Sequence, residues 1–172
     1  AKPLQDYMFH KLMDLAEKYK VPVAIHTGLQ AGMGKIIGNS DPTLLTDLII
    51  EYPDVNFVLY HGSYPFGGEL AALAKNYKNV FIDMNWVWSV SPTYSERYLN
   101  EWLETVPVSR LMAFGGDCMA VENVYSELAT AKRLISKTLC NKVSEGYLTE
   151  PEAKRIAKMI LYDNAAKFYN LP

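Results

Sequence analysis

The sequence has few of the residues that would assign it to several large protein classes. Its 172 residues include only two cysteines, Cys118 and Cys140. Two are too few, and too irregularly placed, for a disulfide framework or a cysteine-based zinc site. No apolar run approaches the ~20 residues that a membrane-spanning helix needs, and the first residues lead into an amphipathic pattern and not into a signal-peptide core. These absences predict no membrane partner and favour a protein of the reducing cytoplasm.

An excess of positive charge is also missing. Lys and Arg total 17 against 19 acidic residues, which gives a net charge of −2. A nucleic-acid partner is therefore not expected. Hydrophobic residues make up 49% of the chain and the mean hydropathy is −0.06. These values, with the length, predict one globular domain over residues 1–172.

Strand-like and helix-like segments alternate along the chain. Strands are expected at 21–26, 55–61, 79–86 and 111–117, each largely apolar. Helices are expected at about 4–19, 41–52, 70–77, 98–107, 121–143, 151–161 and 164–169. Crossovers of this length force neighbouring strands to be parallel, so the pattern predicts an α/β fold that is either an open sheet or part of a barrel.

Three sequence details support the expected helices. The first helix would have one apolar face, formed by Leu4, Met8, Leu12, Leu15 and Tyr19. Asp41 precedes Pro42 and can cap the second helix, because aspartate accepts hydrogen bonds from the first turn and proline suits its first position. Thr149 and Glu152 have the spacing of a capping box.

Three of the expected strands end on side chains that can bind metal or move protons. These side chains are His26, His61 and Asp117. A parallel sheet gathers the carboxyl ends of its strands on one face, so residues far apart in sequence can meet there. Neutral imidazole and carboxylate both suit Zn²⁺, Mn²⁺ or Fe²⁺, and a metal with an open position lowers the pKa of bound water to about 7. A lone histidine at a strand end is usually structural, but this combination at the ends of apolar strands points to a site.

Other candidate residues allow a structural interpretation. His10 lies on the first helix beside a lysine, where a solvated face is expected. Asp83 is a carboxylate in an apolar strand and is predicted to be structural, bonded to a neighbouring loop. Tyr64, Trp86 and Trp88 are the predicted substrate contacts, although the two tryptophans fit equally well as a cap on the core.

Four strings in fixed order carry a resemblance to a known family. They are VPVAIHTG at 21–28, VLYHGSYP at 58–65, FGGD at 114–117 and DNAAKFY at 163–169. Together they resemble the amidohydrolase superfamily, in its amidohydrolase 2 type of TIM-barrel metal-dependent hydrolases. The resemblance implies that the chain is the C-terminal half of the barrel, strands five to eight plus C-terminal helices. It also implies that His26 is a metal ligand, His61 a catalytic residue, and Asp117 both a metal ligand and a proton shuttle.

The resemblance implies a function and its alternatives. The first is a metal-dependent hydrolase, or non-oxidative decarboxylase, that acts on a small carboxylate or carbonyl substrate with a divalent cofactor, zinc first and manganese or iron next. A sugar-acid isomerase like the uronate isomerases is a variant. The alternative is an inactive half-barrel or assembly subunit without the cofactor, because the family's His-x-His pair is absent from the sequence. A half-barrel with open sheet edges predicts a homo-oligomer, or pairing with a missing N-terminal half.

Overall fold

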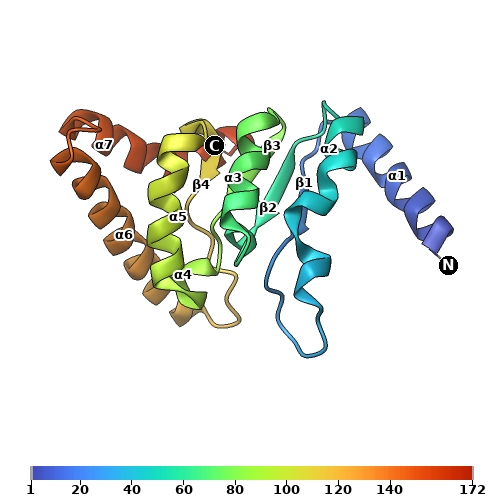
Figure 1. The fold of residues 1–172 in the computed structure, drawn as a ribbon, viewed down its shortest axis with the longest axis horizontal. Helices are drawn as coiled ribbons and strands as arrows, with labels where there is room; N and C mark the ends of the chain where they lie inside the picture. Colours follow the sequence, from blue (N-terminus) through green and yellow to red (C-terminus); the bar gives the residue numbers. More distant parts are fainter. Residues whose placement is uncertain (1, 172) are drawn as a thin grey trace.

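A computed structural model describes residues 2–171, and a sheet of four parallel strands lies at its centre (Figure 1). The strands are β1 (Val23–His26), β2 (Phe57–Tyr60), β3 (Val80–Asp83) and β4 (Leu111–Met112), and they lie side by side in chain order. Each neighbouring pair is parallel. The predicted parallel α/β arrangement is therefore confirmed.

Helices connect the strands, and further helices precede the first strand and follow the last one. In chain order they are α1 (Lys2–Tyr19), α2 (Thr46–Glu51), α3 (Gly67–Asn76), α4 (Val87–Val90), α5 (Pro92–Thr105), α6 (Val121–Ser144), α7 (Glu150–Lys158) and α8 (Asn164–Phe168). Short 3-10 turns are η1 (Ile37–Ser40), η2 (Pro42–Leu45), η3 (His61–Ser63) and η4 (Val108–Arg110), and η5 (Met159–Asp163) is a π-helical segment between α7 and α8. No helix in the described range is long and apolar enough to cross a membrane.

The two predicted helix caps are present. The Asp41 carboxylate accepts from the backbone N–H of Thr43, and Thr149 and Glu152 complete their capping box. The segment after Asp41 differs from the prediction in one respect. It forms the 3-10 turn η2 before the α-helix α2, where one continuous helix was expected.

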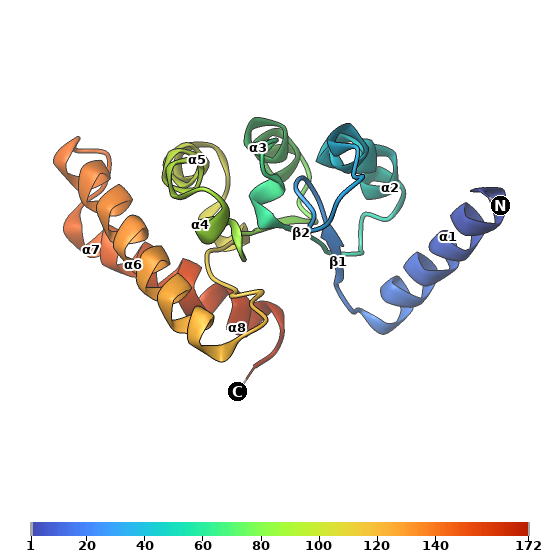
Figure 2. The same ribbon diagram turned by 90° about the horizontal axis from the view of Figure 1, so that it is seen from below.

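The core lies between the sheet and the helices on one of its faces. Figure 2 shows α2, α3 and α5 together on that side, with α8 on the other. Fully buried side chains from both layers fill this space, including Phe57, Leu59, Ile82, Leu111, Leu70 and Trp102. On the other face of β1, Ala24 and His26 are exposed. The four strands thus have one covered face and one face that is partly open.

The paired strands are shorter than predicted at their carboxyl ends. His61 and Trp86 fall just outside β2 and β3, and both have positive φ, at 62° and 58°. Asp117 lies five residues beyond β4, also with positive φ, at 44°. A left-handed residue turns the chain out of the extended conformation and ends the ladder of hydrogen bonds. His61 and Asp117 therefore follow their strands, whereas His26 is the last residue of β1.

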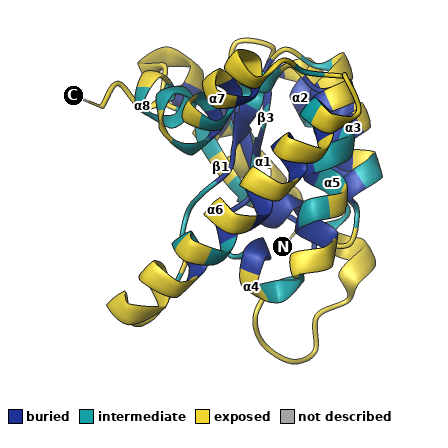
Figure 3. Cartoon of the chain, turned by 90° about the vertical axis from the view of Figure 1, so that its left-hand side faces the viewer, coloured by how far each residue is buried: buried dark blue, intermediate teal, exposed yellow. Residues whose placement is uncertain are grey.

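The first helix forms where it was predicted, but its apolar face is not buried. Only Met13 and Ala16 of α1 are buried, whereas Leu4 is 66% exposed and Leu12 is 55% exposed. Figure 3 shows this helix mostly in the colour of exposed residues. In the described chain this apolar face does not join the core. The reason is that the helix leans away from the sheet (Figure 1), so no described element covers that side.

Candidate metal centre

The three strand-end residues come together at the carboxyl ends of the strands. One ligand atom from each of His26, His61 and Asp117 lies within 4.8 Å of the others. The two imidazole rings have centroids 4.9 Å apart. Nε2 of His61 lies 3.8 Å from Oδ2 of Asp117. The parallel register explains this convergence, because it aligns the carboxyl ends of β1 and β2 at the same edge of the sheet.

His61 lies in a turn that the protein holds in an unusual conformation. His61, Gly62 and Ser63 all have positive φ, at 62°, 53° and 52°. Several contacts fix this turn: the Tyr94 hydroxyl donates to the Gly62 carbonyl at 2.7 Å, and the hydroxyls of Thr27 and Ser63 lie 2.7 Å apart. Non-glycine residues in this region are strained and are found where a function requires them.

The environment of His61 favours its neutral form. The side chain is only 2% exposed. Burial lowers its pKa below the ordinary value, and the backbone carbonyl of Asn85 opposes that shift only in part. A neutral imidazole keeps a free nitrogen lone pair, which can bind a cation or accept a proton.

His26 and Asp117 are more open to solvent. His26 is exposed at the end of β1, and the Asp117 side chain is 49% exposed. The loop after His26 folds back through Gly28, whose N–H donates to the Ser40 carbonyl at 2.7 Å. The site thus combines one buried histidine with two groups that are open to solvent.

The predicted substrate contacts have three different positions. The Trp86 ring lies edge-on to His61, with centroids 5.1 Å apart, and so borders the site. Tyr64 is half-buried and its ring packs against Tyr94 at 4.7 Å. Trp88 is fully buried, and its indole N–H donates to the Ala113 carbonyl at 2.7 Å. The geometry gives the role predicted for Trp88 no support, because its apolar surface packs in the core and its polar atom is already bonded there.

Sequence reasoning missed two residues of this site and assigned a third no role in its chemistry. The Tyr60 ring lies edge-on to His26, with centroids 5.3 Å apart, and Asn85 hydrogen-bonds to His61 twice. Asp83, interpreted as structural, accepts from the backbone N–H of Asn85, and burial raises its pKa to about 6. A signal for Tyr60 existed, since it is the β2 residue in register with His26. Asn85 gave none, because an asparagine after a strand is ordinary in turns.

The donor set fits a divalent cation. Two imidazoles and a carboxylate are ligand types that zinc, manganese and iron accept. Ligands that share one zinc ion lie at most about 4 Å apart, twice the usual metal–ligand distance. The 4.8 Å spread of His26, His61 and Asp117 exceeds this limit, so side-chain rotations would have to bring these groups closer together before they could share one ion.

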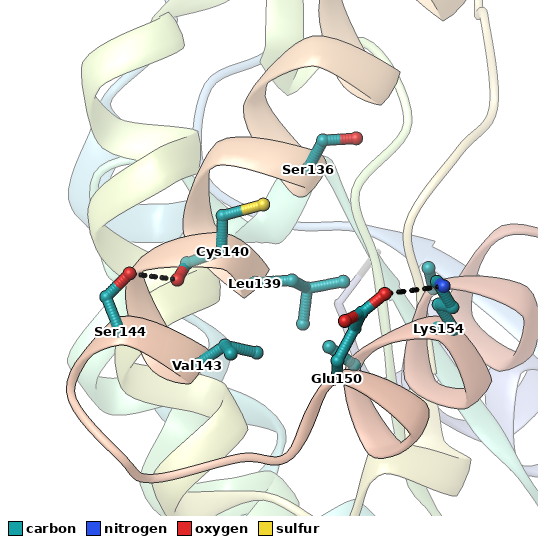
Figure 4. Close-up of a pocket in the computed structure, with 9 residues that line it drawn as sticks. Ser136, Leu139, Cys140, Val143, Ser144, Glu150 and Lys154 are labelled. Atoms are coloured by element: carbon teal, nitrogen blue, oxygen red, sulfur yellow. Dashed lines mark hydrogen bonds and ion pairs between the residues drawn. The ribbon is translucent and has the colours of Figure 1, made fainter.

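A separate cavity lies between the outer helices α6 and α7. Its volume is about 430 Å³, and its walls include Leu139, Cys140, Val143 and Ala153. Figure 4 shows Cys140 and Glu150 on opposite sides of it, with Glu150 paired to Lys154. None of the three metal-site residues lines this cavity. It is therefore a different feature from the candidate metal centre.

Comparison with known proteins places the chain in a family. The family model described as amidohydrolase matches residues 1–171. The chain belongs to the amidohydrolase family. This amidohydrolase is 33% identical over 176 residues to protein fluG of Emericella nidulans, covering 99% of the chain and 20% of that protein. It is also 26% identical over 106 residues to the uronate isomerase of Nostoc punctiforme, covering 62% of the chain and 22% of that protein.

Solved structures show the fold of this amidohydrolase. A Lactobacillus casei protein described as a metal-dependent hydrolase superposes with a TM-score of 0.83 at 23% identity, over 99% of the chain and 44% of that structure. A uronate isomerase from Bacillus halodurans gives a TM-score of 0.77 at 21% identity, over 94% of the chain and 41% of that structure. The four strand–helix units therefore form part of a barrel, as predicted. The chain spans about a fifth of the length of its curated relatives.

Proposed function

We propose that this amidohydrolase is, or forms part of, a metal-dependent hydrolase of a small carboxylate or carbonyl substrate. The observation that carries the proposal is the convergence of His26, His61 and Asp117 within 4.8 Å. The family membership and the likeness to the Lactobacillus casei structure support it. Non-oxidative decarboxylation of a similar substrate uses the same groups and is the closest variant.

Each residue has a role in this proposal. His26 and Asp117 hold the divalent cation, zinc first and manganese or iron as alternatives. His61, neutral and buried, accepts and returns a proton through Nε2, and Asp117 also shuttles a proton from its solvent-exposed side. When bound, the cation supplies Lewis-acid polarisation of a substrate oxygen and lowers the pKa of water. Trp86 and Tyr64 contact the substrate at the rim.

Isomerisation of a sugar acid is the second candidate. It rests on the likeness to the uronate isomerase of Nostoc punctiforme and on the solved uronate isomerases. Glucuronate incubated with the zinc-loaded full-length protein in D₂O separates the candidates. An isomerase forms the ketose and exchanges a substrate C–H proton, whereas a hydrolase leaves glucuronate unchanged.

We also propose that a preceding half-barrel covers the open side of this chain. The described chain leaves the outer edge of β1 unpaired and the apolar face of α1 exposed. The chain covers only 44% of the Lactobacillus casei structure, so that protein has more than enough further residues for the other half of a barrel. A second copy of this chain is the other possible occupant. The inactive assembly subunit remains the alternative to the enzyme.

Metal analysis of the full-length protein tests the proposed function. We expect one divalent ion per chain in the wild type, and a loss of at least about tenfold in His26→Ala and in Asp117→Ala, since each removes a ligand. His10→Ala is the matched control, because His10 lies on α1 and bonds to Tyr52, away from the strand ends. Unchanged metal content in both ligand variants contradicts the proposal, and a wild type without metal or activity supports the inactive subunit.

A further inference from the structure

Asn85 contacts His61 through two separate hydrogen bonds. The backbone N–H of His61 donates to the side-chain Oδ1 of Asn85 at 3.2 Å. The ring nitrogen Nδ1 of His61 lies 3.3 Å from the backbone carbonyl oxygen of Asn85. Both residues are buried, at 2% and 8% exposure. One residue from the loop after β3 therefore holds both the backbone and the ring of the residue after β2.

The ring contact selects one tautomer of His61. A carbonyl oxygen can only accept, so Nδ1 must carry the hydrogen. In a neutral imidazole the lone pair is then on Nε2. That atom faces Oδ2 of Asp117 at 3.8 Å and belongs to the cluster that fits a cation. Asn85 thus directs the reactive lone pair of His61 into the site.

The backbone contact holds a strained residue. His61 has a φ of 62°, and Ser63, two residues later, has a φ of 52°. The Tyr94 hydroxyl fixes the Gly62 carbonyl, and Thr27 contacts the Ser63 hydroxyl. Asn85 supplies the hydrogen bond at the start of this turn. Without it the buried N–H of His61 would lose its partner, which favours relaxation of the turn.

Asn85 itself is fixed by contacts to the end of β3 and to the segment after β4. Its N–H donates to Oδ1 of Asp83 at 2.8 Å, and the next N–H, that of Trp86, donates to the Gly115 carbonyl at 3.1 Å. A Cβ atom placed on Gly115 would lie 2.7 Å from Cβ of Asn85. The glycine is therefore required for this close approach. This gives Gly115, the first glycine of the pair before Asp117, a function that the sequence alone did not reveal.

We propose that Asn85 is a positioning residue that sets the tautomer and orientation of His61. It connects the ends of β2, β3 and β4, so His61 and Asp117 keep a fixed relation. The consequence for metal binding rests on the proposed function. The tautomer itself does not, since it follows from hydrogen bonds within the chain.

Three variants of the full-length protein test this proposal. Asn85→Ala removes the Oδ1 acceptor and keeps the backbone carbonyl, so it acts on the ring of His61 through relaxation of the turn. Asn85→Asp restores an oxygen in the same place. Asn79→Ala is the matched control: Asn79 is also buried, immediately precedes β3, and donates to three backbone carbonyls, those of Ile49, Tyr52 and Val55. Asn79→Ala should lower the melting temperature of the protein without changing any contact of His61.

Two measurements are needed. Long-range ¹H–¹⁵N correlation spectra report which ring nitrogen of His61 is protonated, with the signal assigned by its absence in His61→Gln. Competition with a chromophoric chelator reports zinc affinity. We expect Nδ1–H in the wild type and a mixture of tautomers in Asn85→Ala. We also expect a zinc affinity lowered by about 10–100-fold in that variant, the usual cost of losing an outer contact at a metal site, because the His61 lone pair would no longer face the cation held by His26 and Asp117.

The outcomes separate positioning from simple stability. Recovery of the wild-type tautomer in Asn85→Asp, with normal zinc affinity in Asn79→Ala, supports the proposal. A wild type protonated on Nε2, or an unchanged His61 spectrum in Asn85→Ala, overturns it. Equal loss of zinc affinity in Asn79→Ala and Asn85→Ala also overturns it. If no variant or wild type binds zinc, the proposed function fails while the tautomer result still decides the role of Asn85.

Discussion

The imidazole of His61 and the carboxylate of Asp117 face each other with Nε2 and Oδ2 3.8 Å apart, although 55 intervening residues separate them in sequence. The two groups differ in environment. His61 is 2% exposed and Asp117 is 49% exposed. Burial keeps the pKa of the His61 imidazole low, whereas the Asp117 carboxylate stays in contact with solvent. The asymmetry gives the two groups different chemistry at one site.

The loop after His26 depends on Gly28. This glycine has a φ of 69°, and a Cβ there would lie 2.2 Å from the Tyr64 carbonyl oxygen, a backbone atom that cannot easily move. We expect Gly28→Ala to lower the free energy of unfolding by about 2 kcal/mol or more, from strain and clash together. Chemical denaturation measures this. Gly38→Ala is the control, because no atom lies within 4 Å of the added methyl group, and a loss of similar size there would contradict the argument.

The hydroxyl of Tyr94 is expected to stabilise the turn that carries His61. Tyr94 is 8% exposed and its hydroxyl donates to the Gly62 carbonyl at 2.7 Å. Tyr94→Phe should cost about 1–2 kcal/mol, because it leaves a buried carbonyl without its donor. Thermal unfolding measures the change. Tyr125→Phe, at a residue 79% exposed, should have almost no effect, and a neutral Tyr94→Phe would show that the hydrogen bond is dispensable.

Asp83 is expected to make stability depend on pH. Burial is the main reason that its pKa rises from 3.8 to about 6, with Asp117 adding to the shift and the Asn85 N–H opposing it. The folded state therefore binds a proton more tightly than the unfolded state. Protonation of Asp83 therefore stabilises the folded state. This contribution to the free energy of unfolding is complete below pH 3.8 and is lost as the pH rises through about 6.

Asp83→Asn should remove the fall in stability at higher pH, because the amide does not ionise, and it keeps an oxygen for the Asn85 N–H. In chelator-treated protein we expect the variant to match the wild type near pH 4. At pH 7.5 it should exceed the wild type by on the order of 2 kcal/mol. Urea denaturation across this range is the measurement. Asp54→Asn, at a side chain 74% exposed, is the control. A constant difference between Asp83→Asn and wild type at all pH values would contradict the assignment.

The exposed face of α1 predicts self-association of the 172-residue chain when it is produced alone. Leu12 is 55% exposed and Leu15 is 48% exposed on that helix. We expect oligomers or poor solubility, because apolar surface and the open edge of β1 both favour association. Sedimentation velocity tests this, with Leu12→Glu expected to shift the distribution towards monomer and Gln5→Glu, also on α1, expected not to. A monomeric wild-type chain would contradict the prediction that these exposed surfaces drive association.

Much of the fold follows from short-range patterns in the sequence. Alternating apolar strands and amphipathic segments predicted the parallel α/β order, because crossovers of this length exclude antiparallel pairing. The caps at Asp41 and Thr149 were also predictable, since capping depends on residues within one turn. Strand ends were less well predicted. His61 and Trp86 adopt positive φ only because tertiary contacts hold them there.

The sequence by itself determined which residues reach the carboxyl side of the sheet. His26 ends an apolar strand and His61 and Asp117 follow apolar strands, and parallel pairing gathers such ends together. The tertiary structure alone decided how they are held. Asn85 meets His61 and Gly115 admits Asn85 because three separate strand ends approach one another, and no local pattern encodes such contacts. It likewise decided that Trp88 fills the core and that the apolar face of α1 stays exposed, since burial depends on what lies opposite a side chain in space.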